Sequence, residues 1–312
     1  MPTFAIITPV FNGIDHLRYM RDTLKQQTLK DFEWIVVNDG SEDATKRDYE
    51  EEISGLSFPA KIVHIENGGQ GRARNIGISE STAPWICTID VDDPPYANKI
   101  ETLASLIKDH SEKQVIIGAH ALQVKRGNHL RNQYLTPTAF SNNAEIRKLE
   151  IKRYFKGAAN FFPSSAVFFT RYVVEESGIK YIEDRELIGV EDYIFNMMVL
   201  SIADKIVTTK QVCGIYLRHP GNISRATFHH FQSVIKALIR VAEELDLKEA
   251  LRWAIASKCA SYASPLYSSG WKLKMATFKY GVSHSGLIFF LRAFLSKSMR
   301  NIYKFLKTML LT

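Results

Sequence analysis

The sequence predicts an α/β fold with a mostly parallel central sheet and a helical C-terminal extension. The first observation behind this prediction is that short apolar runs alternate with polar, helix-like stretches over the first hundred residues. The second is that turn-forming and acidic clusters close those runs. Alternation of this kind is typical of βαβ units, in which helices cover both faces of a parallel sheet. The apolar runs span residues 4–10, 34–37, 61–65 and 85–89.

The length of 312 residues is enough for one large α/β domain with an appendage. We expect the α/β domain to span residues 1–225, with a regular half over 1–105 and a less regular half over 106–225. Residues 226–312 have the character of helices, with a break expected near residue 280. The sequence contains no internal repeat and no linker rich in proline or serine.

Cysteine content and the N-terminal sequence indicate the compartment. The three cysteines are far apart and none belongs to a CxxC pair, which argues against a zinc site or a disulfide framework and favours a reducing environment. The first residues contain no basic segment followed by a long apolar run. No window approaches the roughly 18 apolar residues of a membrane span. We therefore expect a cytoplasmic protein.

Positive charge is concentrated in the C-terminal part of the chain. No Asp or Glu follows Glu249, whereas ten Lys or Arg lie between Arg252 and Lys307. Removing these ten charges from the net charge of +7 leaves −3 for residues 1–249. On a helix over residues 287–311, the basic side chains fall within about 140° of arc and lie opposite a broad apolar face.

An anionic membrane surface is the partner that this pattern favours. A basic amphipathic helix can lie in the membrane interface, held by apolar burial and by attraction to anionic lipid. The alternative is a helix packed on the protein with its basic side in water. Nucleic acid is not expected as a partner, because the rest of the chain is slightly negative and carries no nucleic-acid motif. We expect peripheral association with the inner face of the cell membrane.

The cluster Asp90-Val91-Asp92-Asp93 follows the apolar run at 85–89 and is the most informative motif. Three carboxylates in four residues repel one another unless a positive group lies among them. A divalent cation that bridges a diphosphate is a common solution, because oxygen ligands suit Mg²⁺ or Mn²⁺ and these ions keep coordination sites for phosphate. The alternative is a solvated acidic turn, which Pro94 and Pro95 would favour.

Two weaker motifs follow the first and second runs. Thr8-Pro9-Val10-Phe11-Asn12 ends the first run, and Asn38-Asp39-Gly40-Ser41 ends the second. In a parallel sheet, ligands bind beyond the carboxyl ends of the strands, where both segments fall. Asp39 can accept a hydrogen bond from a base or a ribose. The alternative for the second segment is an ordinary turn, since these residues favour turns.

A glycine-rich segment runs from Gly68 to Gly77 and carries two arginines. The dinucleotide fingerprint would need glycine where Arg74 stands, and it would follow the first strand and not the third. The segment also contains no Walker A lysine. What remains is a glycine-rich entry to a helix, suited to an anion through the helix dipole and the guanidinium groups. The alternative is a capped surface helix.

The second half of the domain contains three further candidate site residues, two acidic residues and a histidine. Glu191-Asp192 opens an apolar helix-like run, and either carboxylate can be a general base or a helix-capping residue. His219 lies in a polar loop after an apolar strand and can reach a diphosphate or a metal ion, although a lone histidine is more often structural.

In this order and spacing, the motifs closely resemble the family 2 glycosyltransferases, which are inverting enzymes with the GT-A (nucleotide-diphospho-sugar transferase) fold. The resemblance covers about residues 3–225, and the segments are specific together but not singly. It implies a nucleotide-sugar-binding half over 1–105 and an acceptor-binding half over 106–225. The segments that carry it are Thr8 to Asn12, Val36 to Ser41, Gly69 to Gly77, Ile89 to Asp93 and Val190 to Asp192.

The resemblance implies a hexosyltransferase in which Asp192 is the catalytic base and Glu191 positions the acceptor. A DxD motif would hold a Mn²⁺ or Mg²⁺ ion that stabilises the departing nucleoside diphosphate, for which we expect UDP. The residues expected to bind the nucleotide are Thr8, Pro9, Phe11, Asn12, Asp39, Gly69, Arg74, Asn75, Asp90 and Val91. The residues expected to hold the metal are Asp92, Asp90 and His219.

The expected reaction is transfer of a sugar to a hydroxyl of a glycan or lipid-linked acceptor during synthesis of a cell-surface polysaccharide, such as a lipopolysaccharide or capsule. One alternative is a sugar-nucleotide pyrophosphorylase, but such enzymes resemble one another in a basic glycine-rich loop after the first strand. Here Pro9 to Gly13 takes that place. The other alternative is a non-catalytic protein that binds a sugar nucleotide or a membrane.

Overall fold

A computed structural model describes residues 1–107, 113–126, 129–135, 140–156, 163–218, 227–263 and 271–285. Its chain divides into two compact units. The first comprises residues 1–147 and 160–222, and the second comprises 148–159 and 223–312. The domain bounds given above stay a prediction, and residues 148–156 group with the second unit. The segments 219–226 and 286–312, which include His219 and the predicted amphipathic helix at 287–311, lie outside the described residues.

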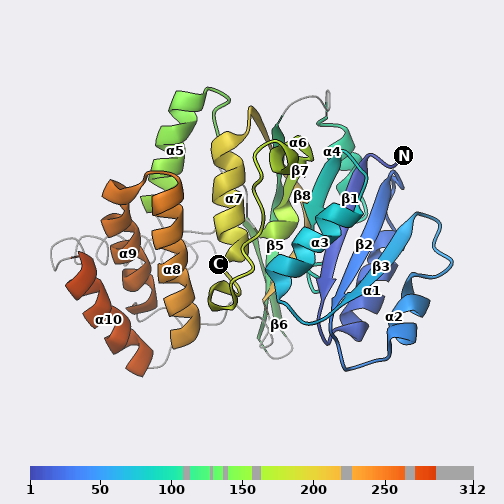
Figure 1. Ribbon diagram of the computed structural model, residues 1–312, viewed down its shortest axis with the longest axis horizontal. Helices are drawn as coiled ribbons and strands as arrows, with labels where there is room; N and C mark the ends of the chain where they lie inside the picture. The colour runs from blue at the N-terminus through green and yellow to red at the C-terminus, as the bar shows by residue number, and fades with distance from the viewer. Residues whose placement is uncertain are drawn as a thin grey trace. The chain divides into compact units, whose positions relative to one another are not determined.

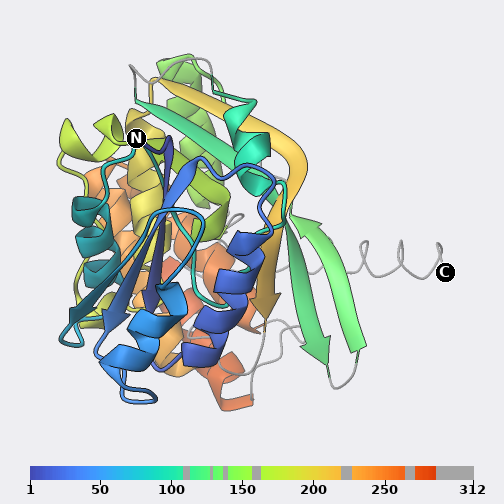
Figure 2. The ribbon, with the colours of Figure 1, turned by 90° about the vertical axis from the view of Figure 1, so that its right-hand side faces the viewer.

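A single mixed sheet of eight strands forms the centre of the first unit, in the order β3-β2-β1-β4-β7-β5-β6 with β8 paired to β5 (Figure 1). Four of the seven strand pairings are parallel, which confirms the predicted mostly parallel sheet. Figure 2 shows the antiparallel pair β5–β6 as adjacent arrows. The strands are β1 (Phe4–Val10), β2 (Phe32–Asp39), β3 (Ala60–Ile65), β4 (Trp85–Thr88), β5 (Gln114–Arg126), β6 (His129–Leu135), β7 (Val167–Thr170) and β8 (Lys205–Arg218).

Helices cover both faces of the sheet. On one face, α1 and α4 contribute Leu17, Met20 and Ile100 to the main apolar cluster. On the other, α3 packs on β1 and β2, and α7 reaches β7 through the Phe169–Phe195 ring pair at 5.2 Å. The helices of this unit are α1 (Ile14–Lys25), α2 (Lys46–Ile53), α3 (Gln70–Glu80), α4 (Lys99–Ala104), the start of α5 (Ala144–Lys156), α6 (Tyr172–Glu175) and α7 (Glu191–Ile202), with short 3-10 helices η1 (Ser164–Ala166) and η2 (Arg185–Leu187).

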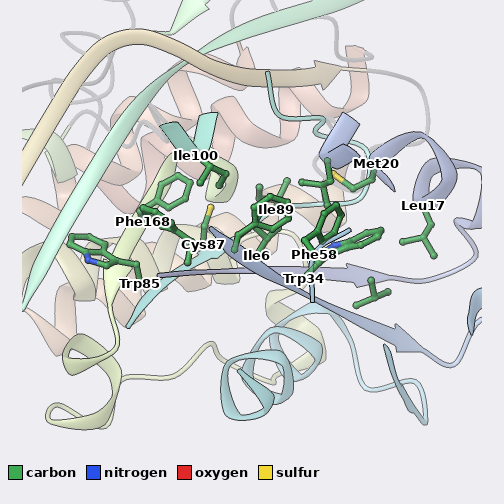
Figure 3. Packing of buried hydrophobic residues seen from close by; sticks show 14 of the residues in the cluster. Ile6, Leu17, Met20, Trp34, Phe58, Trp85, Cys87, Ile89, Ile100 and Phe168 are labelled. Atoms are coloured by element: carbon green, nitrogen blue, oxygen red, sulfur yellow. The ribbon is translucent and has the colours of Figure 1, made fainter. Parts of the chain in front are cut away.

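The main apolar cluster is built from alternate residues of the central strands. Figure 3 shows Ile6, Trp34 and Cys87 pointing from β1, β2 and β4 to the same side, where Met20 and Phe168 lie close to them. Burial of aliphatic and aromatic side chains contributes roughly 1.5–3 kcal/mol for each large one. This cluster fixes the register of the strands, so the positions of their carboxyl ends are fixed as well.

Two glycines allow α3 to lie against the rest of the fold at short range. A side chain at Gly77 would clash with Ile7 on β1, and one at Gly71 would clash with the backbone carbonyl of Ile182. Both positions therefore require a residue without Cβ, since the contacts involve a packed strand and a backbone atom. The first turn of α3 is thereby held close to the segment that leads to α7.

The second unit is helical. It contains α8 (Phe228–Glu244), α9 (Lys248–Ala263), α10 (Trp271–Ser285) and the C-terminal part of α5 (Figure 1). Phe231 packs edge-on against Tyr262 and Tyr280, with ring centroids 5.3 and 5.5 Å apart. The predicted break near residue 280 is wrong, because Tyr280 is anchored in this packing and α10 continues through it. Within the described residues, no helix is long and apolar enough to cross a membrane.

Candidate functional site

The predicted site residues gather where β1, β2 and β4 end and where α3 and α7 begin. The loops after β1 and β2 are tied together by Asn12, whose backbone N–H donates to Ser41 Oγ at 2.9 Å and whose Oδ1 accepts from the N–H of Glu42 at 2.8 Å. Asn12 has a φ of +48°, in the left-handed region that asparagine tolerates. Phe11 beside it is 54% exposed, which leaves an aromatic face available at this edge of the sheet.

Asp39 anchors the glycine-rich segment. Its Oδ1 accepts a hydrogen bond from the N–H of Gly68 at 2.7 Å, and its Oδ2 accepts one from the N–H of Gly69 at 2.9 Å. The Asn67 side chain donates to the backbone carbonyl of Asp39 at 3.0 Å. The Asn67 side chain also lies 3.5 Å from Oδ2 of Asp39. Contact of Asp39 with a base or ribose therefore remains a prediction, and its observed partner is the loop that precedes α3.

Arg74 joins three segments that are distant in the sequence. Its Nη2 lies 2.6 Å from Asp90 Oδ1, and its Nη1 lies 2.7 Å from Glu191 Oε1. The side chains of Arg74 and Glu191 are 1% and 4% exposed. Burial alone would lower the pKa of Arg74, but Asp90 and Glu191 outweigh it and raise this pKa well above the usual value. Arg74 is a buried cation held between two carboxylates, and its contact with a nucleotide remains a prediction.

Tyr181 is part of this network and was missed by the sequence analysis. The Arg74 Cζ lies 5.2 Å from the centre of the Tyr181 ring, which stacks on Phe195 at 3.8 Å. The hydroxyl of Tyr181 is 2.9 Å from Thr88 Oγ1 at the end of β4. Burial raises the pKa of Tyr181, so the phenol stays neutral. No spacing rule links residue 181 to the motifs, which is why only the fold reveals this contact.

Asn75 fixes the segment that carries Tyr181. Its Nδ2 donates to the backbone carbonyl of Tyr181 and to Glu183 Oε1, both at 2.8 Å, and its Oδ1 accepts from the N–H of Tyr181 at 2.9 Å. Thr8 is also turned toward the protein, since its Oγ1 accepts from Trp34 Nε1 at 3.0 Å. The predicted nucleotide contacts of these two residues would have to come from their backbones or after rearrangement, and they remain predictions.

The acidic turn after β4 directs its carboxylates to different places. Asp90 faces Arg74, while Asp93 is 2% exposed and accepts from Ser165 Oγ at 3.3 Å. Asp92 and Val91 are half-buried. The solvated turn considered above does not describe this segment, because Pro94 and Pro95 are buried as well.

The carboxylates of the acidic turn could hold a divalent cation only if water or a bound phosphate completed its coordination. Asp90 and Asp92 offer carboxylate oxygens, the ligands that Mg²⁺ and Mn²⁺ prefer. Asp90 is engaged with Arg74, so any coordination of a cation by Asp90 would be in addition to this ion pair. Among the described residues, no group of three His, Cys, Asp or Glu side chains could hold a metal ion. A cation here would take its remaining ligands from water or phosphate, as Mg²⁺ commonly does.

Glu191 and Asp192 open α7 and have different surroundings. Glu191 Oε2 accepts from the N–H groups of Gly189 and Val190 at 2.6 and 3.0 Å, so both oxygens of this carboxylate are bound within the protein. Asp192 Oδ1 accepts from the N–H of Tyr193 at 2.7 Å. Desolvation and the nearby charge of Glu191 raise the pKa of Asp192 to about 7, although Arg74 opposes this shift. This is the range in which a carboxylate can act as a general base near neutral pH.

The chain is similar to a known protein family and to several known proteins. The family model described as "Glycosyl transferase family 2" matches residues 5–178, more than half of the chain. The chain belongs to glycosyl transferase family 2. An "Uncharacterized glycosyltransferase" of Rickettsia bellii is 39% identical over 132 residues, which cover 41% of this chain and 19% of that protein. The "Amylovoran biosynthesis glycosyltransferase AmsB" of Erwinia amylovora is 26% identical over 220 residues, 69% of each chain.

The chain spans only 19% to 35% of the length of the Rickettsia glycosyltransferases that it matches. The family 2 match therefore covers a part of those proteins, and their full activities do not carry over. Membership of family 2 does remove the pyrophosphorylase alternative, since the matched region includes the acidic turn and the glycine-rich segment.

Solved structures show that the family 2 chain has the GT-A fold. S. aureus TarS 1-349 in complex with UDP-GlcNAc has a TM-score of 0.62 at 16% identity, covering 91% of this chain and 82% of that one. The mannosyltransferase PcManGT of Pyrobaculum calidifontis, in complex with GDP-Man and Mn2+, has a TM-score of 0.53 at 14% identity, covering 94% and 87%. At such identities the likeness concerns the fold alone, and it confirms the predicted fold class.

Replacement of Arg74 should destabilise the fold. In Arg74→Met, Glu191 and Asp90 lose their cation, and removing one partner of a buried ion pair costs about 3–5 kcal/mol. We expect urea denaturation to show a loss of this size in the free energy of unfolding. The matched control is Arg72→Met on the same helix, where the half-buried Arg72 should change stability by less than about 0.5 kcal/mol. Equal losses in the two variants would contradict the role assigned to Arg74.

Asp192 should make stability depend on pH. The folded protein keeps the Asp192 proton up to about pH 7, whereas an unfolded chain releases it near pH 3.9. Folding therefore takes up a proton between these values, and this contribution to stability is lost as the pH rises through that window. Asp192→Asn should be more stable than the unmodified protein by about 1–2 kcal/mol above pH 7 and should show no such gain near pH 4.

Thermal denaturation from pH 4 to pH 8 measures this difference. The control is Glu145→Gln, which removes a carboxylate from an exposed position on α5. A stability difference between Asp192→Asn and the unmodified protein that stays constant over this range would show that Asp192 titrates at its ordinary pKa.

Proposed function

We propose that the chain is a metal-dependent, inverting glycosyltransferase that moves a sugar from a nucleoside-diphosphate donor to an acceptor hydroxyl. The observation that carries the proposal is the double contact of Arg74 with Asp90 and Glu191. It holds the acidic turn close to the start of α7, although the two lie about a hundred residues apart in the sequence. A cation-binding turn and a carboxylate with a pKa near 7 thus share one edge of the sheet.

In the proposed reaction, Asp192 is the general base that acts on the acceptor hydroxyl. Its carboxylate removes the proton of the acceptor hydroxyl while the acceptor oxygen forms a bond to the anomeric carbon of the sugar. The bond from that carbon to the diphosphate oxygen breaks, and the nucleoside diphosphate leaves with the electron pair. A single displacement of this kind inverts the anomeric centre. Glu191 does not move a proton in this scheme, because its two oxygens hold Arg74 and the backbone before α7.

The donor side is assigned to the acidic turn and the loops after β1 and β2. Asp92, assisted by Asp90, would hold a Mn²⁺ or Mg²⁺ ion, and such an ion supplies charge stabilisation to the departing diphosphate. The base and ribose would lie beside Asp39 and the exposed Phe11 ring. UDP is the proposed nucleotide, supported by the fold shared with TarS, whose structure contains UDP-GlcNAc. Mn²⁺ is supported by the mannosyltransferase structure that contains GDP-Man and Mn2+.

Nucleotide binding tests the proposal directly. We expect UDP with Mn²⁺ to raise the melting temperature by about 5 °C at a hundredfold excess over Kd, because a ligand that binds only the folded state stabilises it. GDP, dTDP, CMP and ATP should give smaller shifts. Asp92→Asn or removal of Mn²⁺ with EDTA should abolish most of the effect. Asp15→Asn, a change at an exposed position on α1, should leave it intact.

Turnover separates an enzyme from a binding protein. Asp192→Asn should keep the nucleotide shift and lose at least about 10³-fold in kcat, since loss of a general base costs roughly 10²–10⁴-fold. If Asp192→Asn binds UDP with Mn²⁺ and also hydrolyses or transfers the sugar as fast as the unmodified protein, Asp192 is not the general base. A chain that binds none of the nucleotides is not a sugar-nucleotide transferase.

The acceptor and the membrane form the second part of the proposal. We propose a glycan or lipid-linked acceptor in cell-surface polysaccharide synthesis, with support from the similarity to the amylovoran biosynthesis glycosyltransferase AmsB. The basic residues of the segment 287–311 support peripheral attachment to an anionic bilayer.

The full chain should sediment with vesicles of anionic lipid and not with neutral ones. Changing Lys297, Arg300 and Lys304 to Gln should weaken this by roughly 1 kcal/mol for each charge. Unchanged sedimentation would refute the membrane role.

A further inference from the structure

A buried ammonium group lies behind the acidic turn. Lys99, at the start of α4, is fully buried, and its Nζ donates to the backbone carbonyl of Ser165 on η1 at 2.6 Å. The same Nζ is 3.5 Å from His120 Nε2 on β5 and 5.1 Å from the Phe168 ring centre. Phe168 lies beside Cys87 and Ile100 in the core (Figure 3). A lysine is almost never fully buried without partners, because desolvation of its charge is costly.

His120 is arranged to accept from this lysine. Burial, with the charge of Lys99 added to it, lowers the pKa of His120 well below its usual value, so the ring is neutral. Its Nδ1 is 3.4 Å from the carbonyl of Gly118, which can only accept a hydrogen bond. With its proton on Nδ1, the ring donates to Gly118 and its Nε2 can accept a hydrogen bond from Lys99.

Ser165 links the ammonium to the acidic turn. Its carbonyl accepts from Lys99, and its Oγ donates to Asp93 Oδ2 at 3.3 Å. Lys99, Ser165 and Asp93 are all at most 2% exposed, so these hydrogen bonds lie in surroundings of low polarity. The N–H of Asp93 also donates to the carbonyl of Asp90 at 2.9 Å, which closes the turn around the proposed cation ligand Asp92.

The segment that follows the acidic turn is also hydrogen-bonded to β8. The carbonyl of Pro94 accepts from the N–H of Ile215 at 3.1 Å, and the N–H of Tyr96 donates to the carbonyl of Cys213 at 3.1 Å. Between these two contacts lies Gly214, where a Cβ would come within 3.0 Å of His120 Nε2. The turn is therefore bound to Lys99 through Ser165 and to the backbone of β8 through Pro94 and Tyr96.

We infer that Lys99 is a positioning residue of the cation-binding turn, acting through Ser165 and Asp93. By keeping the third carboxylate of the acidic triplet turned into the core, it leaves Asp90 and Asp92 in place for a divalent cation and a diphosphate. Loss of this anchor changes the packing of Ser165 beneath Asp93, and we expect the turn to present Asp90 and Asp92 less favourably to a cation. The inference rests on the proposed function, and it predicts an effect on cation-dependent affinity in particular.

The test is calorimetric titration of Lys99→Met with UDP, and with GDP in parallel, in Mn²⁺ and in EDTA. Met keeps most of the length of the side chain and removes the group that donates to Ser165. We expect affinity in Mn²⁺ to fall at least tenfold, while the weak affinity in EDTA stays unchanged. The matched control is Ile100→Val, a core change at the next residue, which should leave the ratio of the two affinities unaltered.

A second variant covers the case in which Lys99→Met does not fold. Ser165→Ala removes only the Oγ contact with Asp93, and it should lower affinity in Mn²⁺ severalfold with an unchanged affinity in EDTA. If both variants fold, the double variant should be no weaker than Lys99→Met alone, because both changes break one linkage.

The outcomes separate the two hypotheses. Nucleotide binding in the unmodified protein that does not depend on Mn²⁺, or no binding at all, overturns the proposed function together with this inference. Mn²⁺-dependent binding that is equally tight in the unmodified protein and the Lys99 and Ser165 variants leaves the function standing and overturns the role of Lys99. A proportional loss in Mn²⁺ and in EDTA also overturns it, because it would show only a general distortion of the site.

Discussion

The candidate site depends on the charge of one buried side chain. The Arg74 guanidinium lies between Asp90 and Glu191, and each of these carboxylates is fixed to a different part of the fold. A cation without these partners could not be buried at this depth, and two carboxylates so close together could not both stay ionised without the cation. The acidic turn, the first turn of α3 and the start of α7 therefore form a single electrostatic unit.

This unit explains why adjacent acidic residues have different tasks. Both oxygens of Glu191 accept hydrogen bonds or ion-pair contacts within the protein, so this side chain has a structural role. Desolvation and the neighbouring charge of Glu191 raise the pKa of Asp192, which makes its proton harder to remove. Two acidic residues that are neighbours in the chain thus take different roles. The same division holds in the acidic turn, where Asp90, Asp92 and Asp93 have different surroundings.

The sequence was sufficient for the features that arise locally. Apolar runs that end in turn-forming residues located β1, β2 and β4 and the edge of the sheet at which Asp39 and Asp90 gather, because side-chain alternation and turn preference act over a few residues. The partners of Arg74 could not be predicted in this way. They come from positions 16 and 117 residues away, and a guanidinium suits a phosphate as well as a carboxylate.

The same limit applies to Lys99, His120 and Tyr181. Each is an ordinary residue in its local sequence, and its partners come from segments that are distant in the chain. Strand β7, for example, pairs with both β4 and β5. The helix break expected near residue 280 shows the opposite error. Gly281 lies inside α10, and packing of the Tyr280 ring on Phe231 outweighs the small cost of one glycine in a helix.

The close approach of Gly71 to the carbonyl of Ile182 bears on how such enzymes can be recombined. No side chain fits between these two segments, and Asn75 locks the same segment through Tyr181 one turn later. A chimera that takes its first hundred residues from one relative and the remainder from another would have to inherit both sides of this contact from the same parent. Exchange points that separate α3 from residues 181–191 would give proteins that fail to assemble, whatever donor or acceptor they were designed to use.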